Sequence, residues 1–92
     1  LRRYLERDKE GIRKKLLRVF LDGRKYTTKQ IHSILSEDVE INIRGISAMV
    51  GLMSSRLGIL KTELGEKNKY FLKPEYSELL RSTLEEFEEK SL

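Results

Sequence analysis

The chain has 92 residues, of which 38% are hydrophobic and 37% charged, so it can form one hydrophobic core and one soluble domain. Cysteine is absent and histidine occurs once, at His32, which excludes disulfides, thiolate metal sites and histidine clusters. No apolar run is long enough to cross a membrane, so the composition predicts a cytoplasmic protein.

We expect neither an enzyme nor a cofactor-binding protein. The six glycines are scattered and form no phosphate-binding loop. His32 lies next to Ser33 on a predicted helix, where neighbouring residues point in different directions and cannot act as base and nucleophile. The sequence therefore predicts no catalytic residue and no metal site.

The charge is distributed unevenly along the chain. Residues 1–73 carry 17 Lys and Arg against 9 Asp and Glu, a net charge of +8, whereas residues 74–92 carry 2 against 6, a net charge of −4. A basic body favours nucleic acid or another anionic surface as partner. The acidic end can pair with cations of the same chain or of a second chain.

The first predicted helix covers residues 8–22, with an earlier start near Arg3 as an alternative. Its apolar residues recur at helical spacing and predict one buried face: Leu5, Ile12, Leu16, Val19 and Phe20. If the helix is continuous, its other side carries one exposed cationic stripe of Arg3, Arg7, Lys14 and Arg18. Gly11 disfavours a helix by about 1 kcal/mol relative to alanine, so a bend or a later start there is a second alternative.

A second, shorter helix is predicted over residues 28–36. Gly23 can adopt the left-handed conformation that ends the first helix, and Lys25-Tyr26-Thr27 is long enough for one β-bridge. Thr27 and Gln30 have the spacing of a capping box, or Thr28 is itself the cap. The predicted apolar face of this helix contains Ile31, Ile34 and Leu35.

The third helix is predicted over residues 43–57, with Asn42 as its N-cap. Spacing successive residues about 100° apart gathers the apolar residues on one face. This face contains Ile43, Ile46, Met49, Val50, Met53 and Leu57. The opposite face contains Arg44, Ala48, Gly51, Leu52 and Ser55, with Ser47 and Ser54 nearer the flank.

A β-hairpin over residues 59–73 and a last helix over residues 75–90 follow. Gly58 ends the third helix, and apolar residues then alternate with polar ones, as expected of paired strands. The turn at residues 65–68 can supply a positive φ at Gly65 or Asn68. Pro74 suits the first turn of the last helix, whose apolar stripe contains Tyr76, Leu80, Thr83, Leu84 and Phe87.

Over nearly its whole length the chain resembles winged-helix domains. The resemblance is carried by Thr27-Thr28-Lys29-Gln30-Ile31, by Ile46-Ser47 with Val50, and by Arg56-Leu57-Gly58-Ile59-Leu60 leading into Lys69-Tyr70-Phe71-Leu72. It implies an α+β, mostly helical fold with a three-helix core, a two- or three-stranded antiparallel wing and a C-terminal helix. The chain is also similar to small archaeal winged-helix proteins of uncharacterised function.

The resemblance implies a transcriptional regulator that binds double-stranded DNA. Helix 43–57 would be the recognition helix in the major groove, and the wing tip at residues 65–69 would lie on phosphates. The residues so placed are Arg44, Ser47, Ala48, Gly51 and Ser55 in the groove, Lys29 on phosphate, and Lys67 and Lys69 on the wing. Arg44 is the strongest base reader among them, because its guanidinium can bind guanine through two hydrogen bonds.

Two interpretations remain open, because residues 27–57 have a net charge of zero and the basic excess lies outside them. The first is a DNA-binding homodimer whose interface is the stripe of Tyr76, Leu80, Thr83, Leu84 and Phe87, although this stripe can instead pack on the first helix of its own chain. The second is a protein-interaction module that binds no DNA. In that case the flat face of the third helix packs on a partner, and the cationic stripe meets acidic residues such as 85–89 of the same or a second chain.

Overall fold

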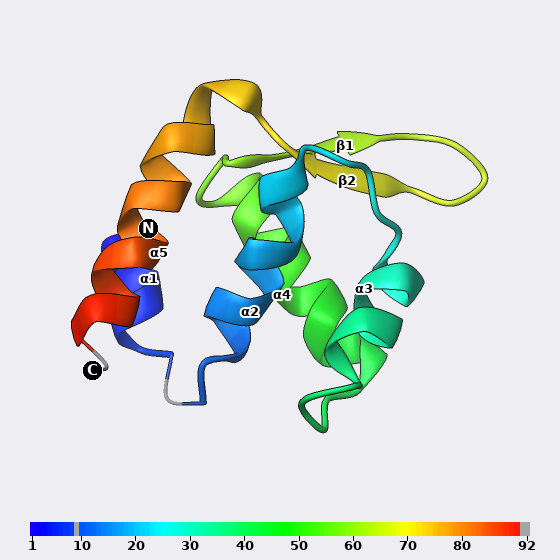
Figure 1. Ribbon diagram of the computed structural model, residues 1–92. Helices are drawn as coiled ribbons and strands as arrows, with labels where there is room; N and C mark the ends of the chain where they lie inside the picture. The colour runs from blue at the N-terminus through cyan, green and yellow to red at the C-terminus, as the bar shows by residue number, and fades with distance from the viewer. Residues whose placement is uncertain (9, 91–92) are drawn as a thin grey trace.

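The computed structural model describes residues 1–8 and 10–90, and over this part the chain is α+β and mostly helical (Figure 1). The elements are α1 (Arg2–Glu6), α2 (Ile12–Val19) with a 3-10 turn η1 (Phe20–Asp22), α3 (Thr28–Leu35), α4 (Ile43–Ser55), strands β1 (Leu60–Glu63) and β2 (Lys69–Leu72), a 3-10 turn η2 (Pro74–Tyr76) and α5 (Ser77–Lys90). No helix in the described ranges is long and apolar enough to span a membrane.

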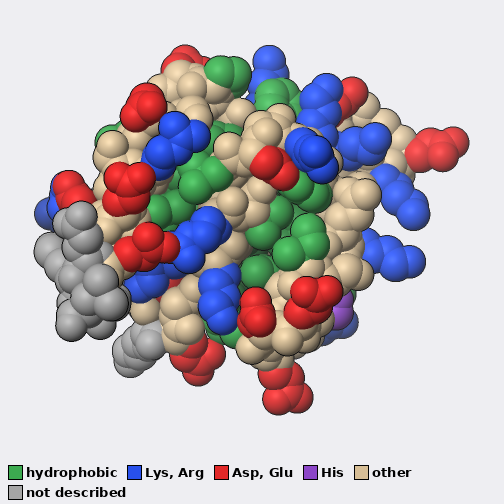
Figure 2. Space-filling view, in the orientation of Figure 1, with side chains coloured by type: hydrophobic (Ala, Val, Ile, Leu, Met, Phe, Trp, Pro, Cys, Tyr) green, Lys and Arg blue, Asp and Glu red, His purple; other side chains and the backbone are tan. Residues whose placement is uncertain are grey.

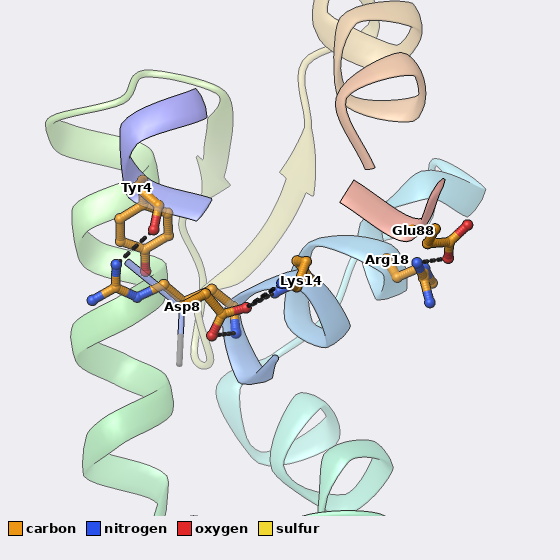
Figure 3. A network of polar contacts seen from close by, with 6 residues as sticks. Tyr4, Asp8, Lys14, Arg18 and Glu88 are labelled. Atoms are coloured by element: carbon orange, nitrogen blue, oxygen red, sulfur yellow. Dashed lines mark hydrogen bonds and ion pairs between the residues drawn. The ribbon is translucent and has the colours of Figure 1, made fainter. Parts of the chain in front are cut away.

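The first helix is broken at Gly11, so the prediction of one helix over residues 8–22 is wrong in its start, and the alternative of a later start at Gly11 is confirmed. Helix α1 ends at Glu6, and α2 begins only after Gly11, which has a φ of 76° and acts as the N-cap. The carboxylate of Asp8 reaches across the break and accepts the backbone N–H groups of Arg13 (3.1 Å) and Lys14 (3.0 Å) (Figure 3). The break also divides the predicted cationic stripe, with Arg3 on α1 and Lys14 on α2.

Replacing Asp8 by alanine is expected to lower the free energy of unfolding by about 1–2 kcal/mol, because two N–H groups at the start of α2 lose their acceptor. The Asp8 side chain is only 4% exposed, so water cannot fully replace the carboxylate. Urea denaturation followed by circular dichroism measures the loss. The control is Asp38→Ala, at an exposed carboxylate, for which a loss below about 0.5 kcal/mol is expected. Equal losses in the two variants would contradict the role of Asp8 as a cap.

The predicted starts of the next two helices are confirmed. Thr27 Oγ1 accepts the Gln30 N–H (3.1 Å) while Gln30 Oε1 accepts the Thr27 N–H (2.9 Å), which is the capping box that opens α3. Asn42 Oδ1 accepts the Gly45 N–H at the start of α4 (2.9 Å). At the other end, α4 stops at Ser55, and Gly58 adopts a φ of 67° where the chain turns into the sheet.

The hairpin pairs β1 and β2 antiparallel, with Leu60 opposite Leu72 and Glu63 opposite Lys69. The expected positive φ at Gly65 or Asn68 is wrong, because only Gly11, Gly23 and Gly58 have a positive φ among the described residues. Residues 64–68 form a longer connection that does not require it. The predicted bridge before α3 is confirmed: Tyr26 and Tyr70 exchange two backbone hydrogen bonds of 2.9 and 2.7 Å.

Every helix and both strands contribute buried apolar side chains to one core. The buried residues are Leu5, Leu16, Leu17, Phe20, Ile31, Leu35, Ile46, Val50, Met53, Ile59, Leu60, Leu72, Leu80 and Leu84. Leu17 was not predicted to be buried. Conversely Ile34 and Ile43, predicted on apolar faces, are 40% and 42% exposed.

The apolar stripe of α5 contributes to this core, as the alternative in which it packs inside its own chain predicted. Leu80, Thr83 and Leu84 are 0%, 5% and 2% exposed within the single chain, and Tyr76 and Phe87 are partly buried against the core. Helix α5 packs against α2 and η1 (Figure 1). Leu80, Thr83 and Leu84 are therefore buried within their own chain, as the alternative interpretation proposed, and a homodimer that uses α5 stays a prediction.

Candidate nucleic-acid interface

The face of α4 that points away from the core is small and polar, as its periodicity predicted. Arg44, Ser47, Ala48 and Ser55 are exposed. Apart from the adjacent residues and the backbone of α4 itself, no described atom lies within 4 Å of the position that a Cβ on Gly51 would occupy. A flat surface of this kind lets the helix backbone come close to whatever it contacts. Arg44, in the first turn of α4, is the long cationic side chain of this group.

The serines on α4 have less freedom than their exposure suggests. Ser55 Oγ donates to the Gly51 carbonyl (2.7 Å), and Ser54 Oγ donates to the Val50 carbonyl (2.9 Å). Their hydroxyl protons are used within the helix, so each oxygen remains mainly an acceptor for an incoming donor. Ser55 therefore suits a base amino group better than a phosphate oxygen, which itself only accepts.

The predicted phosphate-binding lysines lie on two other elements. Lys29 is exposed in the first turn of α3, and Lys67 and Lys69 are exposed at the turn of the hairpin and at the start of β2. Figure 1 shows the hairpin projecting beyond the helices on the side where α3 begins. The predicted residues thus belong to three parts of the fold: α4, α3 and the hairpin.

A lysine from the segment before α3 neutralises the acid at the base of the hairpin. Lys25 Nζ lies 2.8 Å from Glu63 Oε2, and this hydrogen bond and charge lower the pKa of the Glu63 carboxyl below its ordinary value. Lys69 is the residue opposite Glu63 across the hairpin, but the ion pair goes to Lys25. Within the described ranges, Lys67 and Lys69 consequently carry no ion pair of their own.

Acidic residues of α5 neutralise cations on only one side of the molecule. Glu86 pairs with Arg2 at 2.6 Å, and Glu88 pairs with Arg18 (Figure 3). Figure 2 shows acidic and basic side chains mixed over the part of this face that carries α5, whereas Lys and Arg side chains gather over the hairpin. The sequence raised pairing of the cationic stripe with residues 85–89 of the same chain. The pair of Arg18 with Glu88 fits that alternative, whereas Arg2 lies outside the predicted stripe. The cations of α4 and of the hairpin turn take no part in these ion pairs.

Sequence reasoning missed two arginines that lie beside α4. Arg13 and Arg56, together with Arg3 and Arg7, line a pocket of about 370 Å³ between α1 and the C-terminal half of α4. The only sequence signal for this arrangement is the pair of Asp8 and Gly11, which break the helix so that α1 is a separate element. The sequence did not show that α1 would lie against α4.

The rest of the described surface offers little chemistry. No three His, Asp or Glu side chains among the described residues gather as metal ligands. His32 Nε2 donates to the Ile41 carbonyl (2.9 Å) and so ties α3 to the segment before α4, which is a structural role. A hydrogen bond from Tyr26 to the Asp22 carboxylate raises the pKa of the Tyr26 hydroxyl above its ordinary value.

Comparison with known proteins finds relatives without an assigned activity. Residues 1–80 match the family described as "Protein of unknown function (DUF2551)". A protein of Archaeoglobus fulgidus, described as uncharacterised, is 65% identical over 89 residues, which cover 96% of this chain and 92% of the relative. No solved structure matches the chain. The resemblance to uncharacterised archaeal proteins is confirmed in this respect.

Proposed function

We propose that this chain, which belongs to the DUF2551 family, is a cytoplasmic winged-helix protein that binds double-stranded DNA and regulates transcription. In this proposal α4 enters the major groove, and the hairpin is the wing whose turn lies on the phosphate backbone. The observation that carries the proposal is the exposed face of α4, which is flat at Ala48 and Gly51 and has an arginine in its first turn.

The dimensions of the major groove support this placement. The groove is about 12 Å wide and admits one α-helix, and recognition helices contact base edges mainly through their N-terminal residues. Arg44 is the second residue of α4, where its guanidinium can reach the two acceptors of a guanine. The small residues at the next turns, Ala48 and Gly51, allow the close approach that this contact needs.

Affinity in this proposal comes from cations outside α4, because residues 27–57 carry no net charge. Lys29, Lys67 and Lys69 are exposed on neighbouring elements and form no ion pair among the described residues, although Lys69 lies opposite Glu63 in the hairpin. Because Leu80, Thr83 and Leu84 of α5 are buried in the core, a single chain is the smallest unit that can present these cations to a duplex.

The test measures the binding of a labelled, mixed-sequence duplex by fluorescence anisotropy at several salt concentrations. We expect an affinity that falls steeply with salt, and a loss of at least about tenfold in Arg44→Ala combined with Lys67→Ala and Lys69→Ala. The matched control removes three cations on the α5 side, Arg2→Ala, Arg18→Ala and Arg81→Ala, so the change in net charge is the same. Absence of binding at low salt, or equal losses in both triple variants, would contradict the proposal.

An alternative function is a protein-interaction module that binds no DNA. The observation in its favour is Ile43, which is 42% exposed at the start of α4 beside the flat face of small residues. A helix of another protein could pack closely against Ala48 and Gly51 with Ile43 as an apolar contact. If the duplex does not bind at low salt, this alternative is the better account of the α4 face.

A further inference from the structure

The pocket between α1 and α4 is lined by a concentration of positive charge. Four arginines from three elements line it: Arg3 and Arg7 from α1 and its end, Arg13 from α2, and Arg56 at the end of α4. The remaining lining is Tyr4, Leu52 and Leu57, and it includes no acidic side chain. The pocket of about 370 Å³ is thus a cationic rim over a largely apolar floor.

Arg13 is held in a fixed orientation. Its guanidinium carbon lies 4.1 Å from the centre of the Tyr4 ring, and Nη1 donates to the Tyr4 carbonyl oxygen (2.7 Å). Burial raises the pKa of the Tyr4 hydroxyl, so the ring stays neutral beneath the guanidinium. A guanidinium carries five N–H donors, and this hydrogen bond uses one of them. Most of the donors of Arg13 therefore remain, on a side chain that already lies in place.

The arginines of the pocket form no ion pair within the described part of the protein, and Arg7 and Arg13 also line a neighbouring hollow that contains Asp8 and Glu10. Arg3, Arg7 and Arg56 form no ion pair among the described residues, in contrast to Arg2 and Arg18, which the glutamates of α5 neutralise. Asp8 is the acid that follows Arg7 in the chain, but both of its carboxylate oxygens are occupied by α2. Gathering four like charges is unfavourable, and a bound anion relieves this repulsion.

The geometry favours a tetrahedral anion attached to an organic group. A carboxylate offers two oxygens in one plane, whereas a phosphate presents oxygens in several directions and can accept from arginines that approach from different elements. Tyr4, Leu52 and Leu57 provide an apolar surface for a group bonded to the phosphate. We propose that this pocket binds the phosphate group of a phosphate ester.

Two sources can supply that phosphate. One is the backbone of a duplex held on α4. The pocket adjoins this helix, because Leu52 lies in α4 and Arg56 is its C-cap. This source rests on the proposed DNA-binding function and adds the pocket as a backbone contact. The other source is a free phosphorylated small molecule, which does not depend on DNA binding.

The experiment compares Arg3→Ala with Arg7→Ala, as a double variant, against the parent chain. Both side chains are exposed and make no ion pair among the described residues, so the fold is expected to persist, which circular dichroism checks. The matched control is Arg2→Ala with Arg18→Ala, which removes the same charge from the α5 side. Arg13 is left unchanged because its contacts with Tyr4 hold α1 in place.

Two probes distinguish the sources. For the duplex, we expect the double variant to bind at least about tenfold more weakly than the parent chain. We also expect the slope of log affinity against log salt concentration to become smaller by about two, and both changes to be smaller in the control. For the free ester, adenosine 5′-monophosphate is titrated by calorimetry and by the NMR signals of the arginine Nε–H groups. Binding by the parent and its loss in the double variant would assign the pocket to a free ligand.

Binding of either probe to the parent chain, with a loss in the double variant, supports the phosphate pocket and identifies the source of the phosphate. The proposal is overturned if the double variant and the control behave alike toward both the duplex and the nucleotide, or if neither probe binds to the parent chain. The two proposals fail separately: a parent chain that binds the nucleotide but no duplex would contradict DNA binding and leave the phosphate pocket standing.

Discussion

A chain that ends at Lys73 is expected to be unfolded in water. The truncation removes Leu80 and Leu84, which are 0% and 2% exposed, together with the rest of α5 that covers α2 and η1. Removing a buried leucine side chain costs about 2–5 kcal/mol, and the whole stability of a domain is about 5–15 kcal/mol. The loss of two such side chains with their helix therefore approaches the total stability.

A point variant tests the same interpretation without removing the helix. Leu80→Ala is expected to lower the free energy of unfolding by about 2–5 kcal/mol, whereas Leu79→Ala, at a leucine that is 52% exposed, is expected to cost less than about 1 kcal/mol. Urea denaturation monitored by circular dichroism compares the two. A truncated chain that unfolds cooperatively at the parent's midpoint, or equal losses at Leu79 and Leu80, would show that α5 does not belong to the core.

The second large effect is expected at Phe20, which joins the helices to the sheet. Its side chain is wholly buried, and its ring forms a T-shaped pair with the Tyr26 ring, with 5.9 Å between the ring centroids and an angle of 80° between the ring planes. Tyr26 in turn bridges to Tyr70 in β2. Phe20→Ala is expected to lower the free energy of unfolding by about 3–5 kcal/mol, because it leaves a cavity and removes this aromatic contact.

The matched variant for Phe20 is Phe71→Ala. The Phe71 ring is only half-buried, and Lys25 Nζ lies 5.3 Å from its centre. Its removal leaves no enclosed cavity, so a smaller loss is expected in the same urea experiment. If the two substitutions lowered the free energy of unfolding equally, Phe20 would not have the connecting role that its position indicates.

Local signals in the sequence predicted the middle of the fold well. Thr27 with Gln30, and Asn42, open α3 and α4 as expected, because capping acts between residues three positions apart and can be recognised in the sequence. The single bridge at Tyr26 was predicted for a similar reason, since the segment before α3 is too short for a strand. The exposed face of α4 followed from helical periodicity alone.

Features that depend on distant contacts were not predictable in the same way. Asp8 caps α2 through N–H groups five and six residues ahead, across a glycine in the left-handed conformation, which no local pattern describes. The stripe on α5 was recognised, but an apolar stripe does not reveal whether it packs on its own chain or on a second copy. The pocket joins Arg3 to Arg56, and only the folded chain brings them together.

The role of the α4 face and of the turn lysines remains a prediction, because exposure tells which side chains are available and not what they bind. The sequence could identify Arg44 as a candidate base reader from its type and position. It could not show that the hydroxyls of Ser54 and Ser55 already donate within the helix, since that depends on side-chain rotamers.

The bridge between Tyr26 and Tyr70 attaches the hairpin to the segment before α3, near the start of β2. Two backbone hydrogen bonds fix the chain at Tyr70, and the residues beyond it, from Lys69 through the turn, are exposed. We expect any bending of the turn to end at these two hydrogen bonds and to leave α3 and α4 in place. The exposed turn could then change its conformation on contact with a surface, while the helices keep their arrangement.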